Sequence, residues 1–193
     1  QLEDFFYEVS GIKATIKVMS NQEYENMNKA KAPVVEVKEE VEDFDDHLSA
    51  ELTFDNFVVG NCNRIAQNAA LAVALKPGTY NPLFLHSNSG LGKTHLLNAI
   101  GNYVKTKFPG KRILYTNAEA FVNDYVEAIG NNTIATFNRR YRSVDILLID
   151  DIQFIANKEG SMEMFFNIFN TLQHSGKQIV ITSDKPPVEL KGM

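Results

Sequence analysis

From about residue 51 onward, the hydrophobic positions alternate between two kinds of run. Short, nearly continuous apolar runs are typical of buried strands, and longer runs with apolar positions three or four apart are typical of helices that cover a sheet. Strands are expected at 83–86, 112–116, 145–150 and 178–182, and helices from Asn63 and at 93–107, 118–130, 132–141 and 160–174. This alternation predicts an α/β fold, with a parallel sheet covered by helices on both faces and a ligand at the carboxyl ends of the strands.

A phosphate-binding loop is predicted between the first strand and the helix after it. Residues 87–94 read Ser-Asn-Ser-Gly-Leu-Gly-Lys-Thr, close to the pattern G-x-x-x-x-G-K-[ST]. Gly90 and Gly92 let the backbone approach a phosphate, Lys93 adds a positive charge, and the Thr94 hydroxyl can ligate Mg²⁺. Ser87 replaces the first glycine, at a steric cost if its φ is positive. A plain turn before an exposed lysine is disfavoured, because strand, loop and helix follow in the required order.

Carboxylates at the ends of two later strands are expected to complete this site. Asp150 and Asp151 follow a run of four apolar residues. Asp150 is expected in the Mg²⁺ shell, and Asp151 is expected to orient or deprotonate the attacking water. Asp184 follows the last strand and is a candidate sensor of the terminal phosphate. The alternatives are a helix cap or turn for the Asp-Asp pair and a simple turn for Asp184.

Charge marks a boundary before the α/β part. Residues 21–50 contain nine acidic and three basic residues, a net charge of −6, whereas the whole chain is −5, so the remainder is +1. A segment this charged and poor in aromatic residues is expected to be a flexible acidic linker. Residues 1–20 are expected to be the remnant of a small α+β domain or a fraying segment. Residues 51–193 are then expected to form the nucleotide-binding domain.

Composition and a few further residues limit the classes of protein that the sequence can encode. The 193 residues are 44% hydrophobic, with a single cysteine and no apolar run long enough to span a membrane, so a soluble protein is expected. Cys62 is expected to be a small buried side chain, and the four histidines show no metal-ligand spacing. Three arginines surround Tyr141 at 139–142, a pattern that suits either nucleic acid or a solvated helix end.

Six segments are informative when taken together: Phe-Asp-Asn-Phe-Val-Val-Gly at 54–60, Asn-Pro-Leu-Phe-Leu at 81–85, Gly-Leu-Gly-Lys-Thr-His-Leu at 90–96, Arg-Ser-Val-Asp at 142–145, Leu-Ile-Asp-Asp-Ile-Gln-Phe at 148–154 and Thr-Ser-Asp-Lys-Pro-Pro at 182–187. Together they resemble the DnaA family of bacterial chromosomal replication initiators, whose ATPase is of the AAA+ class. The resemblance covers about residues 51–193 and implies a P-loop AAA+ core.

The resemblance also implies ATP and Mg²⁺ as cofactors and places residues around them. It assigns ATP contacts to Val59, Asn63, Gly90, Leu91, Gly92, Lys93, Thr94 and His95. Thr94 and Asp150 would hold Mg²⁺, while Asp151 and Asp184 would have catalytic roles. Val126 and Lys158 match positions that contact single-stranded DNA. Ser87 and Asn88 replace two usual glycines, and Gly160 stands where a basic residue is common.

The function implied is an ATP-controlled switch in DNA replication initiation. ATP-bound subunits would assemble as a helical oligomer on origin DNA, melt the adjacent duplex and help to load the replicative helicase. The same resemblance implies a cytoplasmic protein that also contacts acidic phospholipid membrane surfaces. The arginine finger, the second sensor and the domain that reads double-stranded origin DNA would lie beyond Met193. The ATP-binding domain is therefore expected to be incomplete and to bind ATP with little hydrolysis.

Two alternative functions remain at this point. One is a helicase loader or regulatory AAA+ homologue, against which the long acidic linker favours the initiator. The other is a nucleotide-binding interaction module without turnover, which the missing downstream motifs favour.

Overall fold

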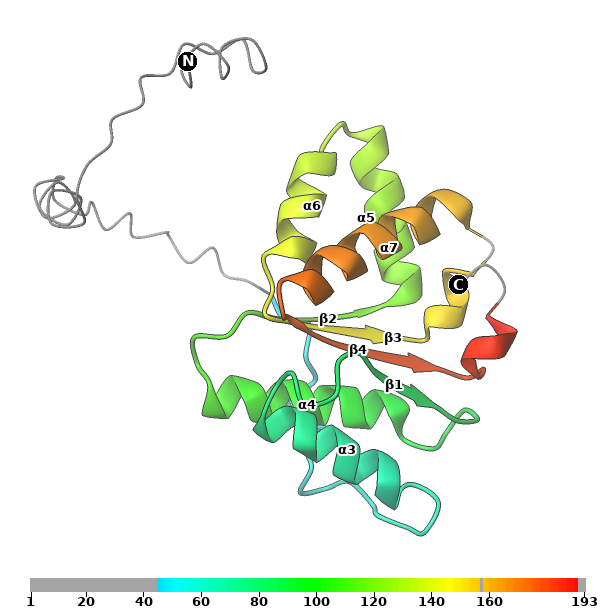
Figure 1. The fold of residues 1–193 in the computed structure, drawn as a ribbon. Coiled ribbons are helices and arrows are strands. Elements are labelled where there is room, and N and C mark those ends of the chain that lie inside the picture. Colours follow the sequence, from blue (N-terminus) through cyan, green and yellow to red (C-terminus); the bar gives the residue numbers. More distant parts are fainter. Residues whose placement is uncertain (1–44, 157, 191–193) are drawn as a thin grey trace, which may run out of the picture. The chain divides into compact units, whose positions relative to one another are not determined.

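The computed structural model describes residues 45–156 and 158–190. These residues form a parallel four-stranded sheet with helices on both faces (Figure 1). In sheet order the strands are β1 (Leu83–His86), β4 (Gln178–Ser183), β3 (Ile146–Asp150) and β2 (Ile113–Asn117). The predicted fold class is confirmed. Residues 1–44, where the N-terminal remnant and most of the linker were expected, lie outside the described residues.

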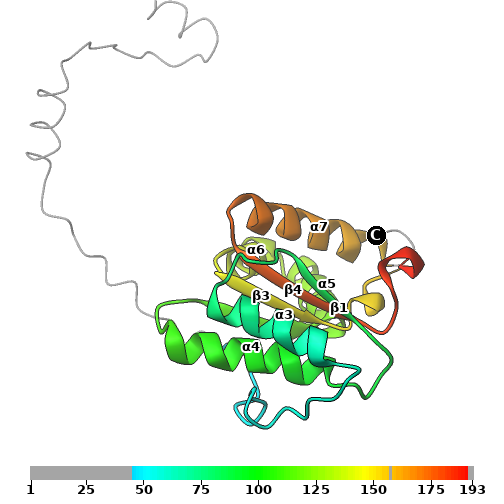
Figure 2. The same cartoon turned by 60° about the horizontal axis from the view of Figure 1, so that its bottom comes forward.

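Two helical layers bury the two faces of the sheet. Helices α3 (Arg64–Leu75) and α4 (Lys93–Lys107) cover one face, and α5 (Ala118–Gly130), α6 (Ile134–Arg142) and α7 (Glu159–His174) cover the other (Figures 1 and 2). Each layer encloses its own apolar cluster. Short 3-10 helices, η1 (Ile152–Phe154) and η2 (Pro187–Glu189), follow β3 and β4.

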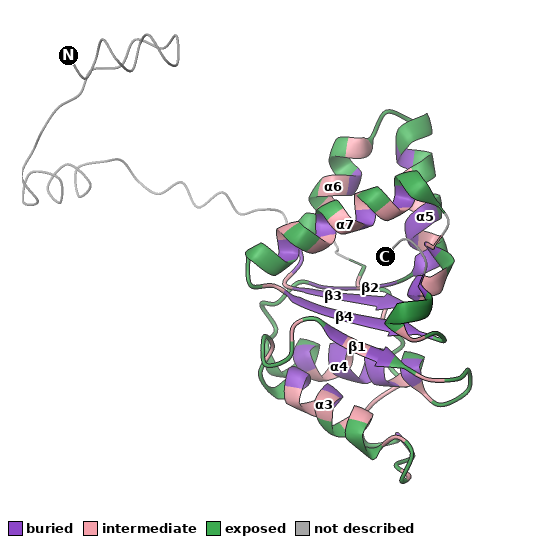
Figure 3. Ribbon diagram, turned by 45° about the vertical axis from the view of Figure 1, so that its right-hand side comes forward, coloured by how far each residue is buried: buried purple, intermediate pink, exposed green. Residues whose placement is uncertain are grey.

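The two central strands are buried along their whole length. Every residue of β3 and β4 is buried (Figure 3), as expected for strands covered on both faces. Because all pairs are parallel, the strands end at the same edge of the sheet, and the register places Asn117 beside Asp150 and His86 beside Ser183. The carboxylates expected in the site are therefore brought to one edge.

Most expected boundaries agree with the structure within a residue, and the exception is α6. This helix begins at Ile134, two residues later than expected. Asn132 has a φ of 56°, in the left-handed region that a right-handed helix cannot contain. The chain therefore turns there before the helix can start. The helices η1 and η2 were not predicted.

The compact core begins earlier than residue 51. Residues 45–50 were assigned to the linker, but the carbonyl of Asp46 accepts a hydrogen bond from the Tyr115 N–H at 3.0 Å. Leu48 packs against the apolar cluster beneath α3 and α4. The linker boundary is thus corrected: its last residues are part of the core, although their charge is typical of a linker.

The exposure of side chains decides two further expectations, one for Cys62 and one for the residues around Tyr141. Cys62 is exposed, contrary to the prediction, because it lies in the turn before α3. The ring of Tyr141 is 1% exposed and packs against Phe121 and Phe137, so it cannot stack on a base. Arg140 pairs with Asp124 at 3.5 Å, which favours the helix-end interpretation.

Among the described residues, the helices are all too short or too polar to cross a membrane.

Candidate nucleotide-binding site

The loop between β1 and α4 has the backbone of a phosphate cradle. Gly90 and Gly92 have φ values of 81° and 89°, in the left-handed region that favours glycine. A Cβ on Gly92 would also lie 2.7 Å from Cε2 of Phe57. No side chain caps α4, so the N–H groups of its first turn are available to an anion.

Ser87 fits the first glycine position of the loop without strain. Among the described non-glycine residues, only His47, Asn132 and Asp151 have a positive φ. Ser87 is not one of them, and its hydroxyl donates to the Asn88 carbonyl at 3.2 Å. The steric cost considered for this replacement therefore does not arise.

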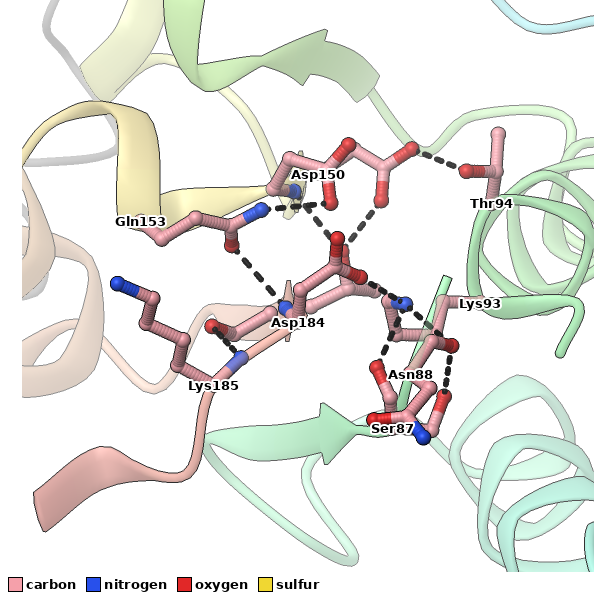
Figure 4. A network of polar contacts seen from close by, with 11 residues as sticks. Ser87, Asn88, Lys93, Thr94, Asp150, Gln153, Asp184 and Lys185 are labelled. Carbon is pink, nitrogen blue, oxygen red and sulfur yellow. Dashed lines mark hydrogen bonds and ion pairs between the residues drawn. The ribbon is translucent and has the colours of Figure 1, made fainter. Parts of the chain in front are cut away.

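Lys93 is the buried charge of the loop. Its side chain is 9% exposed, and Nζ donates to the carbonyls of Ser87 at 2.9 Å and Asn88 at 3.2 Å and to Oδ1 of Asp184 at 2.5 Å (Figure 4). An exposed lysine after a simple turn is thereby excluded. The ammonium group instead connects the loop to the end of β4.

Asp150 is held by three hydroxyl groups from three different elements. Its carboxylate, 3% exposed, accepts from Thr94 at 2.6 Å and Tyr115 at 3.1 Å on Oδ2, and from Thr182 on Oδ1. Burial, followed by the neighbouring charge of Asp150, raises the pKa of the Tyr115 hydroxyl. Asp150 and Thr94 are thus brought together as predicted, whereas Tyr115 and Thr182 were not predicted.

Asp151 adopts a conformation that costs energy for a residue with a side chain. Its φ and ψ are 55° and 51°, and its N–H donates to Oγ1 of Thr182 at 2.9 Å. Partial burial raises the pKa of its carboxyl, opposed by a hydrogen bond from Gln153 and assisted by the charges of Asp150 and Asp184. A raised pKa makes a carboxylate a better proton acceptor. Its side chain does not cap η1, so the cap alternative does not hold.

Gln153 joins the ends of β3 and β4. Its Nε2 donates to Oδ1 of Asp151 at 3.1 Å, and its Oε1 accepts from the Asp184 N–H at 3.2 Å (Figure 4). The turn expected as the alternative for Asp184 is also present, because the Lys185 N–H donates to Oγ of Ser183 at 2.9 Å. Asp184 therefore contacts both Lys93 and Gln153. The link through Gln153 was not predicted.

The remaining predicted ATP contacts lie around the start of α3 and α4. Nε2 of His95 meets the Thr53 carbonyl at 2.7 Å, so its ring is engaged by the preceding segment. Asn63 accepts from the Gly60 N–H at 2.8 Å and donates to the Val58 carbonyl at 3.0 Å, and so holds the turn that carries Val59. The side chains of Val59 and Leu91 are exposed.

The two predicted DNA-contacting residues lie on α5 and just before the start of α7. Val126 is 59% exposed on α5, and Lys158 is exposed immediately before α7. A Cβ on Gly160 would lie 3.9 Å from Cε1 of Tyr125, so the start of α7 lies beside α5. Both side chains are thus on an accessible part of the surface.

The donor set fits Mg²⁺ that is bound together with a nucleotide. Among the described residues, no group of three or more His, Cys, Asp or Glu side chains could hold a metal ion alone. Mg²⁺ in nucleotide sites takes one or two protein oxygens and fills the rest with phosphate and water. The Thr94 hydroxyl and Asp150 carboxylate, 2.6 Å apart, provide these oxygens beside the loop.

Sequence comparison gives one consistent family. The model of the bacterial DnaA ATPase domain matches residues 48–193. The chromosomal replication initiator protein DnaA of Leifsonia xyli subsp. xyli is 50% identical over 162 residues, which are 83% of this chain and 34% of that protein. The chain thus spans about a third of the length of this curated relative.

Solved structures agree with the sequence match. Domain III of Thermotoga maritima DnaA aligns with a TM-score of 0.73 and 51% identity, over 74% of this chain and 60% of that one. A replication initiator DnaA bound to AMPPCP and single-stranded DNA aligns with a TM-score of 0.73 and 42% identity, over 77% and 46%. DnaI, at 20% identity and a TM-score of 0.63, shares the fold alone. The chain belongs to the family of bacterial DnaA ATPase domains.

Proposed function

We propose that this domain binds ATP with Mg²⁺ at the carboxyl edge of its sheet, as the ATP-binding part of a replication initiator. The observation that supports this most is the buried Lys93, whose ammonium group joins the glycine loop to Asp184. The structural relative that binds AMPPCP, an analogue of ATP, supports the same ligand.

The loop and α4 would bind the phosphates. Lys93 exchanges its carbonyl acceptors for phosphate oxygens, and the first N–H groups of α4 donate to the same anion. Thr94 and Asp150 hold the Mg²⁺, which neutralises phosphate charge when bound. The exposed Val58 and Val59 offer an apolar surface for the base, with Asn63 fixing their turn.

Asp151 and Asp184 would act on the terminal phosphate. Asp151 accepts a hydrogen bond from water and orients it, with its carboxylate held by Gln153. Asp184 responds to the phosphate because it shares Lys93 with it. Gln153 links the carboxylate of Asp151 to the backbone N–H of Asp184, and so holds the ends of the two strands together.

Binding without rapid turnover is the expected behaviour of this part of the chain. Within residues 45–156 and 158–190, the hydrogen bonds and ion pairs described for Lys93, Asp150, Asp151 and Asp184 are made with carbonyl, hydroxyl, amide, carboxylate and ammonium groups. Arginine fingers typically contribute ~10³ to 10⁵ in rate. We therefore expect hydrolysis to become faster when an arginine from another segment or another copy reaches the terminal phosphate.

In the cell, we propose that ATP binding controls assembly on origin DNA. ATP-bound copies would oligomerise, melt the adjacent duplex and help to load the replicative helicase. The relative with bound single-stranded DNA and the exposed Val126 and Lys158 support a strand-binding surface on this domain. Double-stranded origin recognition and contact with acidic phospholipid remain expectations from the family resemblance. A helicase loader is disfavoured, because the DnaC helicase loader shares 17% identity with this chain and a DnaA shares 50%.

Calorimetric titration of ATP with Mg²⁺ tests the proposed binding site. The unaltered protein should bind, and Lys93→Ala should lose measurable binding because the buried ammonium is removed. Lys107→Ala, at the exposed end of the same helix, is the matched control and should bind normally. Equal affinity of the Lys93 variant and the unaltered protein would overturn the site assignment.

A further inference from the structure

The segment that leads into the site runs along one face of α4. We call residues 46–57 the strap. Near the end of α4, Nζ of Lys105 pairs with the Asp46 carboxylate. One turn earlier, Nδ2 of Asn102 donates to the carbonyls of Ser49 at 2.8 Å and Leu52 at 2.9 Å. The strap is therefore bound through side chains that lie three residues apart, on the same face of the helix.

The strap continues to the phosphate loop. His95, in the first turn of α4, contacts the Thr53 carbonyl at 2.7 Å and Oδ1 of Asn56 at 3.1 Å. Its ring meets that of Phe57 edge to face, with centroids 5.1 Å apart. Phe57 in turn packs against the Cα side of Gly92, where a Cβ would clash. The strap thus extends along α4 from its last turn to the loop itself.

A glycine in the middle of α4 makes room for the strap. A Cβ on Gly101 would overlap Cδ1 and Cδ2 of Leu48 and lie 3.1 Å from Cδ1 of Leu148. Glycine within a helix costs about 1 kcal/mol relative to alanine. The close approach of Leu48 is a physical reason for glycine at this position.

Asn98 connects the strap to the first turn of α4. Its side chain is 2% exposed, Oδ1 accepts from the Ser49 N–H at 2.8 Å, and Nδ2 donates to the Thr94 carbonyl at 2.9 Å. It also interacts with the Tyr115 hydroxyl. These partners fix which end of the amide is oxygen and which is nitrogen.

Tyr115 makes the second connection. Its backbone N–H donates to the Asp46 carbonyl at 3.0 Å, and its hydroxyl donates to Oδ2 of Asp150 at 3.1 Å. That same oxygen accepts from Thr94. Asn98 and Tyr115 therefore stand between the strap and the two residues assigned to Mg²⁺.

We propose that the strap positions the nucleotide site, with Asn98 as the positioning residue, and that strap docking and Mg²⁺-ATP binding stabilise each other. This inference rests on the proposed function. Coupling between two binding events is reciprocal, so a strap that favours nucleotide must itself be held more firmly when nucleotide is bound.

Two substitutions that loosen the strap without touching the site test the coupling. Gly101→Ala should displace Leu48 while improving helix propensity, and Leu48→Ala should remove the same contact from the other side. Both should weaken Mg²⁺-ATP binding, measured by calorimetry, by about fivefold or more. Gly130→Ala, in a helix and with no atom within 4 Å of the added Cβ, is the matched control and should bind normally.

Hydrogen exchange of the Ser49 and Tyr115 amides provides a second readout. In the unaltered protein, saturating Mg²⁺-ATP should slow exchange at both amides, which face the strap contacts and not the phosphate loop. In Gly101→Ala and Leu48→Ala this slowing should be reduced. Nucleotide binding stabilises the whole fold and so slows every amide that exchanges through global unfolding. A merely structural role for the strap would therefore slow the Ser49 and Tyr115 amides no more than the amide of Lys177, which bonds the Leu172 carbonyl away from the strap.

The outcomes separate this inference from the function on which it rests. Suppose that the unaltered protein binds ATP, that both strap variants bind equally well, and that nucleotide slows the Ser49 and Tyr115 amides no more than the Lys177 amide. The coupling is then refuted and the site assignment stands. If the unaltered protein does not bind ATP, the proposed function and the coupling both fail. Should Gly101→Ala not fold, Leu48→Ala and the exchange of the unaltered protein still decide.

Discussion

Thr182 is uncharged, but it positions both Asp150 and Asp151 in the site. It is fully buried, its hydroxyl donates to Asp150, and the same oxygen accepts from the Asp151 N–H at 2.9 Å. One side chain thus satisfies both a buried carboxylate and the backbone of a residue in the left-handed conformation. Buried polar groups that lose their partner cost more than the hydrogen bond itself contributed.

We expect Thr182→Val, which keeps the shape and removes the hydroxyl, to lower the free energy of unfolding by about 1 to 3 kcal/mol. Urea unfolding measures this loss, and Mg²⁺-ATP binding should weaken in the same variant. Thr171→Val is the control, because its exposed hydroxyl bonds only the Asn167 carbonyl one turn away. A Thr182 variant as stable as the Thr171 variant would show that the hydroxyl does not hold the Asp150 carboxylate and the Asp151 backbone.

The sequence could predict the roles of residues whose contacts are made with near neighbours in the chain. Gly90, Lys93 and Thr94 follow one another in a loop whose geometry depends on neighbours in the chain, and strand, loop and helix follow in the predicted order. Thr182 and Tyr115 meet Asp150 only through the pairing of three strands. No sequence pattern near Thr182 or Tyr115 indicates the register of these strands, so the contacts of both side chains with Asp150 could not be predicted.

At the scale of elements, Asp145 connects the starts of three strands. These starts lie at the edge of the sheet opposite the nucleotide site. Asp145 precedes β3, and its carboxylate accepts from Nζ of Lys177 at 2.6 Å, before β4, and from the Arg112 N–H at 3.0 Å, before β2. Lys111 lies 3.5 Å away. Burial alone would raise the pKa of this carboxyl, but the bonds from Lys177 and Arg112 and the charge of Lys111 hold it below its usual value.

This lowered pKa gives stability a defined pH dependence. Because the folded-state pKa lies below the unfolded value of about 3.9, the stabilisation is complete above the unfolded value and is lost as pH falls through the folded one. Asp145→Asn should therefore be less stable than the unaltered protein at neutral pH, with the difference shrinking as the solution is acidified below about pH 4. Denaturant unfolding at several pH values measures the difference.

Asp55→Asn controls for the loss of one negative charge, because Asp55 is exposed. It should show little difference from the unaltered protein at any of these pH values. A difference for Asp145→Asn that stayed constant down to acid pH would contradict the role given to its charge.

For the whole molecule, the alternation of strands and helices was sufficient to predict a parallel sheet with two helical layers. The strand order β1-β4-β3-β2 was not predictable, because it depends on which buried strands pair across the core. The start of the core was misplaced for a related reason. The acidic residues around Asp46 are typical of a linker, yet its backbone bonds Tyr115 and its carboxylate pairs with Lys105, two partners distant in sequence.

The central claim is that ATP binds at the carboxyl edge of the sheet and that Lys93 binds its phosphates. A crystal structure with Mg²⁺ and AMPPCP tests it most directly. The account predicts phosphate oxygens on Lys93 Nζ in place of the Ser87 and Asn88 carbonyls, with Mg²⁺ between Thr94 and Asp150. A nucleotide bound elsewhere, with Lys93 still on both carbonyls and on Asp184, would contradict it.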